Sequence, residues 1–186
     1  MELQKFGIKL FFKPNGSYPS KDFIPVFHNW IQKNSVPDHL LIDVIDYSHI
    51  QDGPGIMLIA HEGQVSLDKE NNSPGLLYLR TSKIEGDFQK RFKYAFATLI
   101  NTARLLHNNE IGTNVDFETK AFRFIANDRL LAENNEHNQS IFSKTFNEIL
   151  EKNYPDAKWV IEDYSEMDER LAFTIKFQDD TDIIIN

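Results

Sequence analysis

The chain has 186 residues, of which 41% are hydrophobic and 26% charged, and its formal net charge is −8. This composition excludes a disordered chain, and the length favours one domain that buries a core without a disulfide or a metal. The absence of cysteine excludes thiolate metal sites and a cysteine nucleophile. General binding of nucleic acid is unfavourable, because phosphate backbones repel a negative chain.

The sequence also bears on where the protein works. No segment approaches the roughly 18 apolar residues of a membrane span. Met1–Lys5 lack the apolar stretch of a signal peptide. We therefore expect a cytoplasmic protein that does not act at a membrane. The first 93 residues contain equal numbers of acidic and basic side chains, so the whole net charge falls on the second half, where it suits either solubility or a cationic partner.

The first half of the chain alternates between strand and helix patterns. Alternating apolar residues predict a strand over Lys5–Lys13, ended by a turn at Pro14–Ser17. A helix is expected over about 22–33, capped by Ser20 or Asp22. The apolar run Leu40–Ile45 predicts a well-buried strand. Short turns then favour antiparallel pairing of three more strands, at Ile56–His61, Gln64–Asp68 and Gly75–Thr81.

The second half begins with the longest predicted helix. Asp87 is expected to cap it, and one wide apolar stripe continues to about His107, with Gly112 closing it. The remaining expected elements are a strand at Thr119–Ala126, a helix over 140–153, and strands near Lys158–Tyr164 and Leu171–Phe177. The expected fold class is therefore α+β, an antiparallel sheet with helices packed mainly on one face.

Two segments of the chain resemble each other. Lys-Asn, Pro-Asp and Asp-Tyr-Ser recur in that order in 33–48 and again in 152–165. The recurrence predicts a single domain over 1–186, built from two diverged β-α-β-β repeats with pseudo-two-fold symmetry. These units span about 5–61 and about 119–178, joined by extra strands and the long helix 87–107. The alternative is convergence, because Pro-Asp and Asp-Tyr-Ser are both good turn sequences.

Four stretches resemble a family of uncharacterised bacterial proteins. They are Phe23–Gln32, Leu40–Glu62, Pro74–Arg80 and Phe124–Ala132, of which the DGPG…HE and NDRLLA segments are the most specific. The resemblance covers most of the chain. It implies a bacterial protein and brings no catalytic residues with it.

His61-Glu62 resembles the start of a metalloprotease motif, but the second histidine of that motif is replaced by Val65. If the strands over 40–46 and 55–61 form a hairpin, Asp38 and His39 come close to His61 and Glu62. Imidazole and carboxylate groups suit a divalent metal, so His39, His61 and Glu62 are candidate ligands. The alternative is a solvated edge with a His–carboxylate hydrogen bond.

The opposite end of the same hairpin carries a second polar set, Asp46, His49 and Asp52. A histidine beside carboxylates can act as a general base, so these three are candidate catalytic residues. The hairpin geometry keeps His49 far from His61, so the two histidines are not expected to share a site. The alternative is an ordinary polar loop.

Basic residues gather around the start of the long helix, where the helix dipole adds partial positive charge. Phenylalanines are interleaved with them. An anionic small molecule or an acidic peptide could dock there, and a solvated helix face is the alternative. The candidate ligand-binding residues are Arg80, Lys83, Lys90 and Arg91, with Lys93 beside them.

No nucleophile elbow, phosphate-binding loop or dinucleotide fingerprint occurs in the sequence, and we expect no cofactor. We therefore predict a non-catalytic module that binds a protein partner or a small anion, as a monomer or a homodimer. The alternative is a small-molecule hydrolase that uses a His–carboxylate site, with or without a metal.

Overall fold

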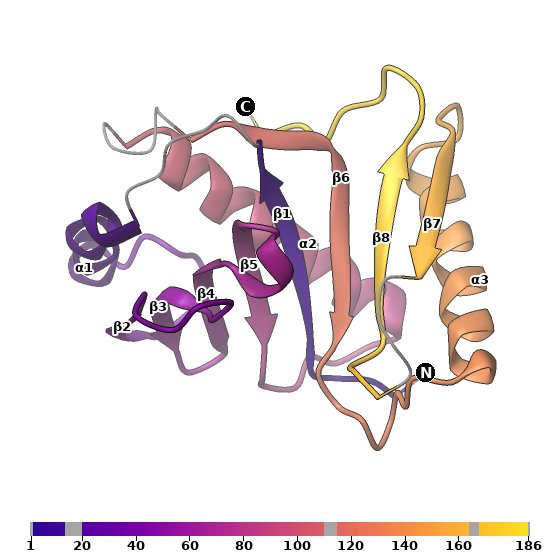
Figure 1. Ribbon diagram of the computed structural model, residues 1–186, viewed down its shortest axis with the longest axis horizontal. Coiled ribbons are helices and arrows are strands. Elements are labelled where there is room, and N and C mark those ends of the chain that lie inside the picture. Colours follow the sequence, from indigo (N-terminus) through magenta and orange to yellow (C-terminus); the bar gives the residue numbers. More distant parts are fainter. Residues whose placement is uncertain (1, 14–19, 110–114, 164–167, 186) are drawn as a thin grey trace.

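The computed structural model describes residues 2–13, 20–109, 115–163 and 168–185 (Figure 1). The turn expected at Pro14–Ser17, the helix stop at Gly112 and the Tyr164-Ser165 pair lie outside the described residues. The described part of the chain forms one eight-stranded sheet in the order β2-β3-β4-β5-β1-β6-β8-β7. Every neighbouring pair is antiparallel, which confirms the predicted α+β class.

Most of the elements lie where the sequence predicts them. The helices are α1 (Phe23–Lys33), α2 (Phe88–His107) and α3 (Glu136–Asn153), and Ser20–Asp22 and Glu70–Asn72 form the short 3-10 turns η1 and η2. The strands are β1 (Phe6–Phe12), β2 (Leu41–Tyr47), β3 (Gly55–Ala60), β4 (Gly63–Asp68), β5 (Gly75–Arg80), β6 (Phe117–Ala126), β7 (Trp159–Asp163) and β8 (Ala172–Phe177).

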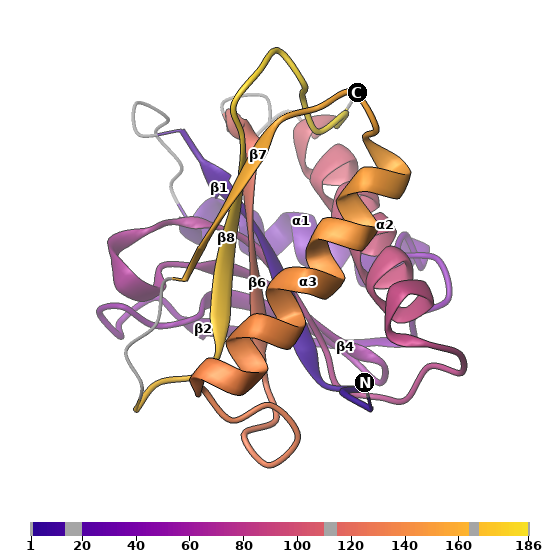
Figure 2. The same cartoon turned by 90° about the vertical axis from the view of Figure 1, so that its right-hand side faces the viewer.

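The N-terminal strand β1 lies inside the sheet, between β5 and β6. Ile8 pairs with Tyr78 on one side and with Phe124 on the other. Because side chains alternate across a strand, these three residues point to the same face of the sheet. All three helices bury their apolar stripes against this face in one core. Figure 2 shows α2 and α3 side by side on that face of the sheet.

Phenylalanine rings fill the centre of the core. Phe88 of α2 contacts Phe6, Phe124, Phe142 and Phe146, with ring centroids 5.6–6.2 Å apart. Aromatic pairs at such separations add stability beyond the area that they bury. The rings therefore join β1, β6, α2 and α3 into one unit.

Three details differ from the sequence prediction. The prediction of a well-buried strand at 40–45 is wrong: β2 is an edge strand, and most of its residues are exposed or half-buried. Asp22 precedes α1 in a helical conformation and makes no side-chain cap. Helix α3 begins at Glu136, four residues before the predicted start, because Asn135 accepts a hydrogen bond from the Asn138 N–H at 2.9 Å.

Strand, helix, strand, strand follow one another in both halves, as β1-α1-β2-β3 and as β6-α3-β7-β8. Within the sheet, β8 pairs directly with β6, whereas β4 and β5 stand between β3 and β1. The internal repeat and its symmetry stay a prediction.

Among the described residues, no helix combines the length and the apolar character that crossing a bilayer requires.

Candidate ligand-binding groove

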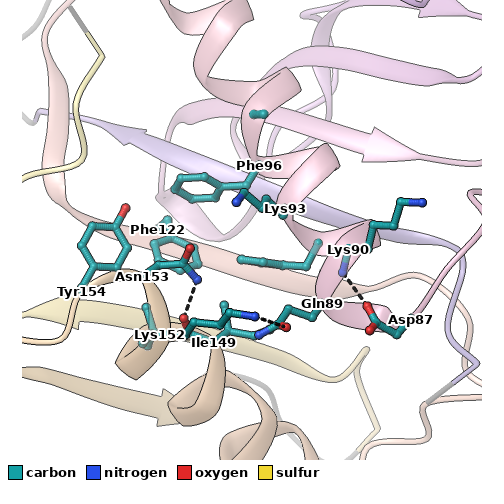
Figure 3. Close-up of a pocket in the computed structure, with 13 residues that line it drawn as sticks. Asp87, Gln89, Lys90, Lys93, Phe96, Phe122, Ile149, Lys152, Asn153 and Tyr154 are labelled. Atoms are coloured by element: carbon teal, nitrogen blue, oxygen red, sulfur yellow. Dashed lines mark hydrogen bonds between the residues drawn. The ribbon is translucent and has the colours of Figure 1, made fainter.

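A groove of about 460 Å³ lies between α2 and α3 (Figure 3). Its size is within the usual range for sites that take small molecules. The first three turns of α2 form one wall, the last turns of α3 form the other, and Phe122 of β6 lies at the bottom. The lining residues are Asp87, Gln89, Lys90, Phe92, Lys93, Phe96, Ala97, Phe122, Ile149, Leu150, Lys152, Asn153 and Tyr154.

The bottom of the groove is apolar and aromatic. Phe92 stacks on Phe96 with ring centroids 5.8 Å apart, and Phe96 meets Phe122 edge-on at 5.1 Å. Ile149 and Leu150 of α3 complete this surface. Phe96 is half-buried, whereas Phe92 and Phe122 are buried. Covering the exposed edge of Phe96 with an apolar ligand would remove apolar surface from water, which favours binding.

Three lysines stand at the rim. Lys90 and Lys93 come from α2 and Lys152 from α3, and all three are exposed. Lys152 Nζ reaches across the groove and donates to Gln89 Oε1 at 3.4 Å. Within the described ranges none of these three ammonium groups takes part in an ion pair. Their positive charge therefore stays available to an anion at the rim.

The start of α2 brings one negative charge to the groove. Asp87 caps the helix, with one carboxylate oxygen accepting from the Lys90 N–H at 2.8 Å. This cap occupies one of the free N–H groups and contributes one negative charge, so the three lysines leave the lining with net positive charge. Positive charge around an apolar surface suits a ligand with one anionic end and one apolar end.

The structure separates the basic residues that the sequence groups together. Of the four candidates, Lys90 lines the groove, and exposed Lys83 lies on the preceding loop outside the lining. Arg80 is buried, donates to the Ser82 carbonyl and to the Tyr78 hydroxyl, and stacks on Tyr94. Arg91 is buried and donates to the carbonyl oxygens of Leu3 and Gly86. The two arginines therefore hold the fold together around the start of α2.

The sequence does not single out Lys152. It lies on α3, 62 residues after Lys90, and no local pattern indicates that the end of α3 lies beside the start of α2. Its position in the last helical turn, after the apolar pair Ile149-Leu150, was visible in the sequence. The tertiary structure shows that Lys152 lies in the wall of the groove.

The hairpin of β2 and β3 has the predicted register near His61 and Glu62. The His61 N–H donates to the Leu40 carbonyl, and a Glu62 carboxylate oxygen accepts from the Leu40 N–H at 2.8 Å. His61 is exposed, with its Nδ1 3.5 Å from Glu62 Oε1. Although partial burial opposes ionisation, the Leu40 N–H and the nearby histidines hold the pKa of Glu62 below its usual range.

His39 is buried, and its ring nitrogens form hydrogen bonds with Pro37 and Tyr78. Its Nδ1 donates to the Pro37 carbonyl at 2.7 Å, because a carbonyl oxygen can only accept. In the neutral ring, Nε2 then accepts from the Tyr78 hydroxyl at 2.7 Å, and that hydroxyl accepts from Arg80 at 3.3 Å. In the part of the chain that the structure describes, no group of three or more His, Cys, Asp or Glu side chains is placed to hold a metal ion.

Asp46, His49 and Asp52 lie at the opposite end of the hairpin, and all three are exposed. Asp46 accepts from the Ser48 N–H at 2.8 Å. Hydrogen bonding from the Ser48 side chain, and then from its N–H, lowers the pKa of Asp46. Asp52 accepts from the Asn72 N–H at 3.4 Å, with its own backbone in a left-handed conformation. The carboxylates thus accept loop backbone N–H groups, and the ring of His49 lies 6.3 Å from that of Tyr47.

A smaller polar pocket of about 230 Å³ lies on the opposite face of the sheet. Three arginines line it, Arg123, Arg129 and Arg170, together with two glutamates. Arg170 is held by Glu70 through two contacts of 2.8 Å. Because its positive charge is largely balanced within the pocket, this site suits an anion less well than the groove does.

No protein-family model matches this chain, and no curated protein matches it.

Proposed function

We propose that this protein is a non-catalytic module that binds a small amphipathic anion in the groove between α2 and α3. The observation that carries the proposal is the combination of an aromatic floor with three lysines free of ion pairs within the described structure. The ligand is a carboxylate or sulfonate with an aromatic or aliphatic tail. Its tail lies on Phe92, Phe96 and Phe122, and its charged end meets the lysines.

The chemistry of the rim favours a singly charged ligand over a polyphosphate. Lysine presents a compact point charge, whereas arginine presents a planar fork that matches phosphate oxygens in pairs. Among the described residues that line the groove there are three lysines and no arginine. The apolar floor gives no partner to the hydroxyl groups of a nucleotide sugar, and leaving such groups unpaired would weaken binding.

The proposal can be tested with two fluorescent probes that share one aromatic skeleton. 8-Anilinonaphthalene-1-sulfonate carries a sulfonate, and N-phenyl-1-naphthylamine is its uncharged counterpart. We expect the folded protein to bind the sulfonate at least about tenfold more tightly, since charge-assisted contacts to lysine add to the apolar contact. Equal affinity for the two probes would contradict the proposal that the groove prefers an anion.

Variants locate the site. Lys93→Glu reverses a rim charge and should weaken sulfonate binding by about tenfold, and Ala97→Trp should block the groove by filling it. Lys83→Glu is the matched control, because it changes the net charge equally and lies outside the lining. If Lys83→Glu weakens binding as much as Lys93→Glu does, the effect is one of overall charge and the assignment to the groove fails.

A further inference from the structure

The outer edge of β2 is an open strand edge. Strand β2 pairs with β3 on one side, and no described strand pairs with its other side. The Val44 N–H donates at 2.7 Å to the carboxylate of its own neighbour, Asp43, instead of to another strand. A row of backbone groups that is open in this way is a template for one more strand.

Exposed apolar side chains accompany this edge. The exposed fractions are 64% for Leu40, 56% for Ile42 and 43% for Ile50. Tyr47, at the end of β2, is also exposed. An added strand would cover part of this surface, and apolar contact between neighbouring strands is a main source of stability in sheets.

The charged side chains of β2 are all acidic, with Lys21 of η1 near Asp46. From residue 34 to residue 68 the sequence contains six acidic residues and no lysine or arginine. Asp43 and Asp46 lie on β2, and both are exposed. Open edges are commonly protected from self-association by lysine, and here the protecting charges are negative. A strand that pairs with β2 should therefore bring positive charge.

We propose that the outer edge of β2 binds an extended segment of a protein partner in which apolar and basic residues alternate. Backbone hydrogen bonds to β2 hold the segment. Asp43 and Asp46 lie three residues apart in β2 and so point to opposite faces of the sheet. The basic residues of the segment therefore meet Asp43 or Asp46 according to its phase, and its apolar residues lie on the other face. A second copy of this chain is the poorer occupant, because pairing β2 with itself would gather four aspartates along one ladder without a cation from residues 34–68.

The test uses synthetic heptapeptides, which match the length of β2. Two alternate lysine with valine in opposite phases, and a third replaces lysine by glutamate. We expect fluorescence anisotropy to detect at least one lysine peptide binding with a Kd below about 1 mM, and the glutamate peptide to bind at least about tenfold more weakly. Absence of binding by both lysine peptides, or equal binding of the glutamate peptide, overturns the proposal.

Val44→Pro provides the test of backbone pairing. Proline removes an N–H that points away from β3, so the variant keeps the inner ladder and should stay folded. It should weaken lysine-peptide binding by about tenfold. Asp43→Lys should weaken it too, and Asp156→Lys, at an exposed aspartate on the loop between α3 and β7, is the matched control.

Sedimentation of the protein without peptide tests whether a second copy of this chain binds the outer edge of β2 instead of a partner segment. We expect the same molecular mass for the native protein and for Val44→Pro. A native dimer that Val44→Pro converts to a monomer would assign the edge to a second copy and overturn the proposal. An unchanged affinity in both Val44→Pro and Asp43→Lys would place the peptide elsewhere, with the same consequence.

Discussion

At the scale of single residues, a buried ion pair is important for the stability of this fold. On the sheet face that the helices leave uncovered, Lys9 of β1 and Asp68 of β4 form an ion pair and are almost fully buried. Burial lowers the pKa of Lys9 and raises the pKa of Asp68, and each partner opposes the shift of the other. Each charge is tolerated because the other is present. The pair thus supports the sheet only as a unit.

Removing one partner should cost much more than removing both charges. We expect Lys9→Met to lower the free energy of unfolding by about 3–5 kcal/mol, because it leaves Asp68 buried without a counter-charge. Lys9→Met/Asp68→Asn should be more stable than Lys9→Met alone, by about 2 kcal/mol. Urea denaturation measures both. A double variant no more stable than Lys9→Met would show that the pair is not the dominant interaction of these side chains.

Tyr78 provides a pH-dependent test of the His39–Tyr78–Arg80 contacts. Burial raises the pKa of Tyr78 to about 12, with the Arg80 side chain opposing the shift. An unfolded tyrosine titrates near pH ~10. Between pH ~10 and ~12 the unfolded chain loses this proton while the folded chain keeps it, so the free energy of unfolding falls as pH rises. The stabilisation is complete below pH ~10 and lost above pH ~12, and it amounts to roughly 2–3 kcal/mol.

The variant Tyr78→Phe removes this contribution. Near neutral pH we expect it to be less stable by about 1–3 kcal/mol, because Arg80 and His39 lose a buried partner. The measurement is urea denaturation of both proteins at pH ~8 and ~11, where the variant should lose less stability than the native protein. Equal losses would mean that Tyr78 titrates normally and that its hydroxyl is accessible to water.

At the scale of elements, hydrophobic periodicity predicts the helices and strands well where one face of each is apolar. The stripe of α2 and the alternation of β1 are examples. The prediction fails at the start of α3, where 136–140 carries no apolar residue and the cap Asn135 alone marks the beginning. It also fails for β2, because an apolar run does not distinguish a central strand from an edge strand that exposes Leu40 and Ile42.

The cap of α3 is therefore worth testing. Asn135→Ala removes the acceptor of the Asn138 N–H, and we expect a loss of about 1 kcal/mol in the free energy of unfolding. Asn135→Ser should keep the cap acceptor without placing a second carboxylate beside Glu133, and should stay within about 0.5 kcal/mol of the native protein. Thermal or urea denaturation of the three proteins provides the comparison. A neutral Asn135→Ala would mean that the first turn of α3 contributes nothing to stability.

At the scale of the whole molecule, the order of the strands in the sheet decides where the site lies. Local sequence patterns do not predict that order. Strand β1 pairs with β5 and β6, which are about 70 and 115 residues away in the sequence. That arrangement brings the end of α3 beside the start of α2 and so creates the groove. Of the four basic residues predicted as ligand-binding, Lys90 alone lines the groove, since burial of Arg80 and Arg91 depends on contacts that the sequence does not reveal.

The central claim is that a small amphipathic anion binds between α2 and α3. The most direct measurement is a titration of ¹⁵N-labelled protein with octanoate, followed through the backbone amide signals. We predict that the largest chemical-shift changes fall in residues 87–97 and 149–154, which form the two walls. Changes centred on Arg123, Arg129 and Arg170 of the opposite pocket, or no changes at millimolar octanoate, would contradict the account.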